Sequence, residues 1–115
     1  MLVTSAWHDG AMNKRVIEVL GFDGCPNIEP VIALVERLLA ESAVDAEVRR
    51  VEVVDADAAA RLRFLGSPSI RVDGRDIEPG ADDRAEYVFA CRVYRTDAGM
   101  SGQPDERWFR DVLAG

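Results

Sequence analysis

Residues 16–28, VIEVLGFDGCPNI, decide the fold of this chain. The segment Val16–Leu20 is short and apolar apart from Glu18, which is typical of a buried β-strand. Two glycines in the next four residues indicate a turn, and Cys25 follows that turn directly. The sequence therefore predicts a strand that leads through a tight turn to a cysteine.

A helix is expected directly after this cysteine. Asn27 is a candidate N-cap, and Pro30 falls in the first turn, where its missing N–H costs nothing. The predicted helix spans Asn27–Ser42 and puts the Cys25 thiol at its N-terminus. Apolar residues recur at helical spacing along it and form one stripe: Ile28, Val31, Ile32, Val35, Leu38 and Leu39.

The rest of the chain continues to alternate strands and helices. Runs of β-branched residues indicate strands, and clusters of glycine, proline and aspartate indicate turns. Helices are indicated where acidic residues are followed by an alanine-rich segment or by apolar residues at helical spacing. The predicted elements are a strand over Glu47–Val54, a helix over Asp55–Leu65 capped by Asp55, strands over Ser69–Val72 and Arg75–Ile77, a loop over Glu78–Glu86, a strand over Tyr87–Arg95, a loop over Thr96–Gln103, and a helix over Pro104–Leu113 with Pro104 at its first position.

This order predicts an α/β fold in which a mixed sheet of four or five strands is flanked by helices. Strands joined through a helix pair in parallel, so Val16–Leu20 should lie centrally and parallel to Glu47–Val54. The strand after Pro68 should run antiparallel to it. Glu18 is difficult to accommodate in a central strand, because its carboxylate needs a sheet end, a partner or an uncovered face.

Composition limits the function classes. The chain has 115 residues, enough for one domain, and we expect residues 1–14 to be a flexible leader before a domain over residues 15–115. A net charge of −7 argues against nucleic-acid partners. Apolar runs are too short to cross a membrane, and the leader lacks the charge order of a signal peptide, so the expected location is the cytoplasm. No metal and no cofactor are predicted, because His8 stands alone.

The chain has two cysteines, so thiol chemistry is the main functional class to consider. A helix N-terminus stabilises the thiolate of Cys25, whereas the acidic neighbours Asp23 and Glu29 oppose it. Cys91 has two interpretations. It is either a small buried hydrophobe on a strand, or a thiol that resolves a disulfide at Cys25. The second requires the two Cα atoms to come within about 7 Å of each other.

These residues resemble the thioredoxin and glutaredoxin superfamily, in which a strand leads to Cys-Pro-x-Cys at a helix N-terminus. Cys25-Pro26-Asn27 matches the first three positions of that motif. Ile28 occupies the fourth position, so no resolving thiol exists within the motif. The resemblance implies a thioredoxin-like sandwich fold.

A second element of the superfamily is a proline, normally cis, that precedes a later strand, and Ser67-Pro68 matches it. The resemblance implies that Cys25 attacks a disulfide and that the backbone around Pro68 pairs with the substrate chain. Substrate contacts are therefore expected at Ser67 and Pro68, and also at Pro26 and Asn27.

A closer resemblance is to small bacterial thioredoxin-like proteins, some with selenocysteine (the DF family), which are often labelled alkylmercury lyase. The residues that carry it are Phe22–Asn27, Leu62–Gly74, Asp76–Pro79 and Cys91–Arg95.

Three functions follow as hypotheses. The first is a thiol–disulfide redox protein in which Cys25 is the nucleophile and Cys91 or an external thiol resolves; its partner would be a thiol or disulfide protein, or a small thiol. The second is a non-catalytic thioredoxin-fold binding module, as a monomer or a homodimer. The third is soft-metal or organomercurial handling by Cys25, Cys91 and Asp23, because such chemistry needs soft thiolates and a proton donor.

Overall fold

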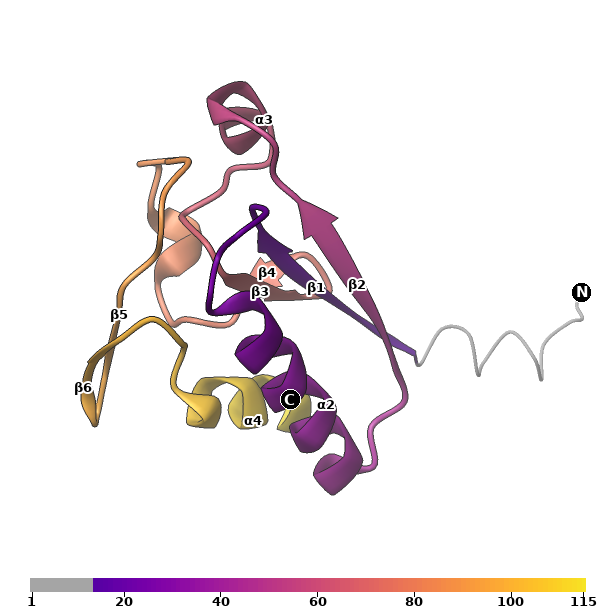
Figure 1. The fold of residues 1–115 in the computed structure, drawn as a ribbon. Helices are drawn as coiled ribbons and strands as arrows, with labels where there is room; N and C mark the ends of the chain where they lie inside the picture. Colours follow the sequence, from indigo (N-terminus) through magenta and orange to yellow (C-terminus); the bar gives the residue numbers. More distant parts are fainter. Residues whose placement is uncertain (1–13) are drawn as a thin grey trace, which may run out of the picture.

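The computed structural model describes residues 14–115. The predicted leader lies outside these residues, apart from Lys14. Over the described part the chain is a mixed α/β structure with a four-stranded mixed sheet and three α-helices (Figure 1). The elements are β1 (Arg15–Gly21), α2 (Ile28–Ser42), β2 (Ala46–Glu52), α3 (Ala56–Arg61), β3 (Ser69–Val72), β4 (Arg75–Asp76), the 3-10 turn η1 (Ala81–Asp83), β5 (Tyr94–Thr96), β6 (Gly99–Ser101) and α4 (Glu106–Ala114).

The four-stranded sheet has the order β2-β1-β3-β4. β1 is central, pairs in parallel with β2 and pairs antiparallel with β3, as the sequence predicts. β3 and β4 form a hairpin whose two turn residues, Asp73 and Gly74, have φ values of 52° and 88°. Positive φ at both turn positions is the geometry that Asp-Gly favours in a tight hairpin.

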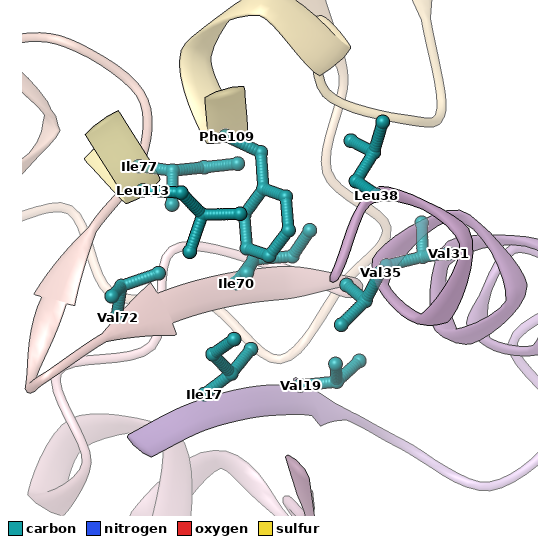
Figure 2. Packing of buried hydrophobic residues seen from close by; sticks show 10 residues of the cluster. All are labelled: Ile17, Val19, Val31, Val35, Leu38, Ile70, Val72, Ile77, Phe109 and Leu113. Carbon is teal, nitrogen blue, oxygen red and sulfur yellow. The ribbon is translucent and has the colours of Figure 1, made fainter. Parts of the chain in front are cut away.

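The main core lies between one face of this sheet and the helices α2 and α4 (Figure 2). Val31, Val35 and Leu38 of the predicted α2 stripe are buried in this core, and Phe109 of α4 points toward β3 in Figure 2. Phe109 and Leu113 are the buried residues of α4. The buried members of this cluster are Ile17, Val19, Val31, Val35, Leu38, Ile70, Val72, Ile77, Phe109 and Leu113.

The opposite face of the sheet is divided into an apolar end and a polar end. Leu20 packs with Phe64 and with residues of α3 in a second, smaller cluster. Towards the start of β1 this face is polar: Glu18 is paired in register with Arg49 of β2 on one side and with Arg71 of β3 on the other. The half-buried Glu18 carboxylate thus lies between two arginine-bearing positions on the polar part of this face, which explains how a central strand accommodates it.

The chain after η1 differs from the prediction. The strand predicted over Tyr87–Arg95 is mostly absent: the chain bends at Phe89 and Ala90, Cys91 forms an isolated bridge, and regular pairing begins only at Tyr94. The loop predicted over Thr96–Gln103 contains β6, which forms a hairpin with β5 apart from the main sheet (Figure 1). Residues 87–93 do not form a strand because they lie against a loop, residues 64–67, and not against a strand.

The helix boundaries also shift. The helix predicted to reach Leu65 ends at Arg61, because Arg63 takes a left-handed φ of 56°. The last helix begins at Glu106, since Asp105 is its N-cap and accepts a bond from the Arg107 N–H. Pro104 therefore precedes the helix and does not open it. Among the described residues, none of the helices combines the length and apolar composition that a membrane crossing requires.

Candidate functional site

Cys25 lies in the turn between β1 and α2, where the sequence predicts it. Its N–H donates to the Phe22 carbonyl at 3.2 Å, and its own carbonyl accepts from the Ile28 N–H at 3.4 Å. Cys25 is buried, with 7% of its surface exposed. The thiol therefore sits at the N-terminal end of α2 in a nearly closed environment.

Gly21 allows two side chains to approach the end of β1. A Cβ at this glycine would lie 1.9 Å from Cδ1 of Ile28 and 2.7 Å from Oγ of Ser67. Ile28 thus fills the space beside the strand end with an apolar side chain. Ser67 is fully buried, and its Oγ has no hydrogen-bond partner within residues 14–115.

The backbone of Ser67 is paired with another part of the same chain. Its N–H donates to the Ala90 carbonyl at 2.8 Å, and its carbonyl accepts from the Arg92 N–H at 2.8 Å. The Ser67–Pro68 peptide bond is cis, the isomer that the resemblance implies. The backbone groups expected to pair with a substrate chain are thus occupied here by residues 90–92.

Cys91 is the residue opposite Ser67 in this pairing. The two form an isolated parallel bridge, and the Cys91 side chain is exposed. The interpretation of Cys91 as a buried hydrophobe is therefore wrong. A ring contact between Phe22 and Phe89, with centroids 5.2 Å apart, joins the Cys25 turn to the Cys91 segment. Both cysteines, as free thiols, belong to segments that meet at the same end of β1.

Arg92, which sequence patterns did not identify as a site residue, holds the Cys91 segment in place. Its guanidinium, 1% exposed, lies 2.7 and 3.2 Å from the two carboxylate oxygens of Asp76 and 2.7 Å from Glu78. It also donates to Ser69 Oγ at 2.8 Å and lies 4.4 Å from the Tyr94 ring centre. Burial works to lower the pKa of Arg92, but the bonds to these carboxylates outweigh burial and raise that pKa overall.

A close backbone approach completes this arrangement. A Cβ at Gly66 would lie 2.8 Å from the Cβ and 3.0 Å from the Cα of Arg92, and Gly66 has a φ of 120°. Glycine is therefore required here both for space and for backbone conformation. The only sequence signal for the buried arginine was its place inside an otherwise apolar run, Cys91 to Tyr94.

The remaining predicted substrate residues lie on the α2 side of the site. Pro26 is exposed. Asn27 is half-buried and makes no capping bond with its side chain. A Cβ at Gly102 would lie 2.4 Å from Nδ2 of Asn27, so the connection between β6 and α4 runs directly against this asparagine.

Within residues 14–115, no group of three or more histidine, cysteine, aspartate or glutamate side chains is arranged to hold a metal ion. Compared with known proteins, the sequence matches no protein-family model and no curated protein.

Proposed function

We propose that this protein is a thioredoxin-like thiol–disulfide redox protein in which Cys25 is the nucleophile and Cys91 the resolving thiol, with an external thiol as the other candidate for resolution. The observation that carries the proposal is the pairing of the exposed Cys91 with Ser67, next to the turn that contains Cys25. The β2-β1-β3-β4 order and the turn–helix that follows β1 agree with the resemblance to thioredoxins.

The chemistry needs two thiolate attacks. The Cys25 thiolate attacks one sulfur of a substrate disulfide, so that a Cys25 mixed disulfide forms while the substrate S–S bond breaks and its other sulfur leaves as a thiolate. The Cys91 thiolate then attacks the Cys25 sulfur and releases the second substrate thiolate. The protein is oxidised to a Cys25–Cys91 disulfide, the substrate is reduced by two electrons, and the protons of the two protein thiols go to the leaving sulfurs. An external thiol reductant restores the dithiol.

The surroundings of each thiol suit its role. Cys25 lies in the turn that leads directly into the N-terminal end of α2. Cys91 stands in an extended segment whose neighbours Val88, Phe89 and Val93 are 41%, 42% and 60% exposed. Exposed apolar side chains around a thiol favour a protein disulfide as substrate, because they can pack against the residues that flank it.

The test is a reaction of the reduced protein with bis(2-hydroxyethyl) disulfide, followed by mass spectrometry of each cysteine-containing peptide. We expect the wild type to form an intramolecular disulfide and to release both halves of the reagent. Cys91→Ser should stop at a mixed disulfide on Cys25. Cys25→Ser should lose turnover with a thiol reductant.

Two outcomes would contradict this proposal. Turnover retained by Cys25→Ser would exclude Cys25 as the nucleophile. A wild-type Cys25 that reacts no faster than a model thiol would favour the non-catalytic binding module. Full turnover by Cys91→Ser would leave Cys25 as the nucleophile and transfer resolution to the external thiol.

A further inference from the structure

A cavity of about 210 Å³ lies on the side of the molecule where the loop after α3 meets the β3–β4 hairpin and η1. Arg63, Arg71 and Arg84 contribute to its lining, together with Asp76 and Asp82. The half-buried Tyr87 closes one side, and Leu65 and Ala81 provide an apolar part of the wall. Three arginines around one small cavity are unexpected in a chain whose net charge is −7.

Arg63 and Arg71 are held in place by neutral groups. Nε of Arg63 donates to the Tyr87 hydroxyl at 3.1 Å, and the guanidinium lies 5.9 Å from the centre of that ring. One terminal nitrogen of Arg71 donates to the carbonyls of Leu62 and Arg63 at 2.6 and 3.0 Å. Within residues 14–115 neither arginine forms a salt bridge with a carboxylate. Hydrogen bonds thus hold both side chains in place, whereas Asp82 acts on Arg63 without direct contact and Arg71 stands in register with Glu18 of β1.

The carboxylates at the cavity are engaged elsewhere. Asp76 is 5% exposed and is bonded to Arg92 through both of its oxygens. Asp82 accepts from the Asp76 N–H at 3.3 Å and pairs with Arg75 at 3.5 Å. The third arginine of the cavity, Arg84, pairs with Glu78 at 3.2 Å. Arg63 and Arg71 are therefore the two arginines of the cavity without a direct carboxylate partner within residues 14–115.

We propose that this cavity binds a small ligand through one oxyanion group, a carboxylate or a phosphate, held by Arg63 and Arg71. A guanidinium offers a planar fork of donors that matches such oxygens, and arginines fixed in advance lose little freedom on binding. The Tyr87 hydroxyl accepts from Arg63 and keeps its own proton to donate to the anion. The cavity is smaller than the roughly 300–1,000 Å³ of drug-sized sites, so the ligand has few atoms beyond its anionic group.

The proposal does not depend on the cysteines. It is tested by NMR titration of the ¹⁵N-labelled full chain with inorganic phosphate and, separately, with succinate, each against sodium chloride at equal ionic strength. We expect saturable shifts at the Nε–H of Arg63 and in the amides around the cavity. Cys25→Ser should bind equally well, so a failure of the redox proposal would leave this result unchanged.

Variants assign the binding to the two arginines. Arg63→Ala should weaken binding about tenfold or more, the loss expected for a charge-assisted hydrogen bond. Arg63→Lys keeps the positive charge but lacks the planar fork of guanidinium donors, so its affinity for the anion should lie between those of the wild type and Arg63→Ala. Arg61→Ala removes an exposed arginine of α3 that does not line the cavity, and should bind as the wild type does. Asp82→Asn removes a negative charge from the cavity and should tighten binding.

Whichever probe saturates identifies the preferred oxyanion. Shifts that do not saturate, that sodium chloride reproduces, or that Arg61→Ala reduces as much as Arg63→Ala would overturn the proposal.

Discussion

Gly66 has no side chain, and this allows the Cys91 segment to pack directly against its backbone. The backbone of Arg92 passes so close that a Cβ at residue 66 would lie 3.0 Å from its Cα. Because the neighbouring atoms belong to the backbone and to a fixed side chain, they cannot move aside cheaply. The conformation of Gly66 and the position of Cys91 are therefore coupled.

Gly66→Ala should destabilise the protein more than a glycine substitution that meets only conformational strain. The matched control is Gly80→Ala, because Gly80 also has a positive φ, 82°, but a Cβ there would meet nothing within 4 Å. We expect the free energy of unfolding in urea to fall by about 1–3 kcal/mol more for Gly66→Ala, the usual cost of overpacking. Equal losses in the two variants would show that the contact with Arg92 is unimportant.

Single residues of the site were predictable where local sequence determines them. Cys25 follows from a strand, two glycines and a helix stripe, and Pro68 follows from its place before a strand. Arg92 was not predictable, because its partners Asp76 and Glu78 lie far away along the chain. Because Asp76 and Glu78 pair with Arg92, this arginine is buried together with Tyr94, and Cys91 is exposed. An apolar-inward pattern would place the cysteine inside and the arginine outside.

At the scale of elements, β1 is apolar on one face and carries a charged residue on the other. Glu18 stands in register between Arg49 and Arg71 on the polar part of the second face. Opposite charges at neighbouring strand positions stabilise a sheet, and like charges destabilise it.

Glu18→Lys should therefore destabilise the protein more than Glu18→Gln. Lysine would place a third positive charge between two arginines, at a cost of up to about 1 kcal/mol per unfavourable pair. The free energy of unfolding in urea, measured at low and high sodium chloride, checks this. High salt should reduce the difference between the two variants, because it screens charges on an open face. A difference that salt does not change would point to packing instead of charge.

The elements that the sequence predicted well are those with a strong apolar pattern. The central strand, the helix after Cys25 and the β3–β4 hairpin lie within a few residues of their predicted limits. The β5–β6 hairpin was missed because its strands have only three residues each and Tyr94 alone among those residues is buried, so they leave no alternating pattern.

For the molecule as a whole, Tyr94 connects the C-terminal part to the main sheet. It is 1% exposed, its hydroxyl donates to the Pro68 carbonyl, and its ring contacts Trp108 of α4 at 6.1 Å between centroids. Burial raises the pKa of Tyr94 well above its ordinary value, and the nearby carboxylates of Asp76 and Glu78 add to this against the charge of Arg92.

This raised pKa predicts a loss of stability in alkali. The unfolded chain releases the Tyr94 proton near its ordinary pKa of about 10, whereas the folded protein retains it. Below that pH Tyr94 is protonated in both the folded and the unfolded chain, and its full contribution to the free energy of unfolding is present. Above it, the free energy of unfolding should fall by up to about 1.4 kcal/mol per pH unit for this one group.

Urea unfolding of the wild type and of Tyr94→Phe, at a series of pH values across this range, measures the effect. Tyr94→Phe should be less stable at neutral pH, because the bond to Pro68 is lost, but it should show a shallower fall in alkali. Parallel curves for the two proteins would contradict the assignment to Tyr94.

The buried ion pairs of Arg92 also have an evolutionary consequence. Loss of Arg92 alone would leave the buried carboxylate of Asp76 without its salt-bridge partner, and loss of Asp76 alone would remove one of the two carboxylates that pair with the buried guanidinium of Arg92. A protein with only one of these residues replaced would be unstable, so the residues at these positions should vary together among related sequences. Lineages that change one of them are expected to have replaced the others as well.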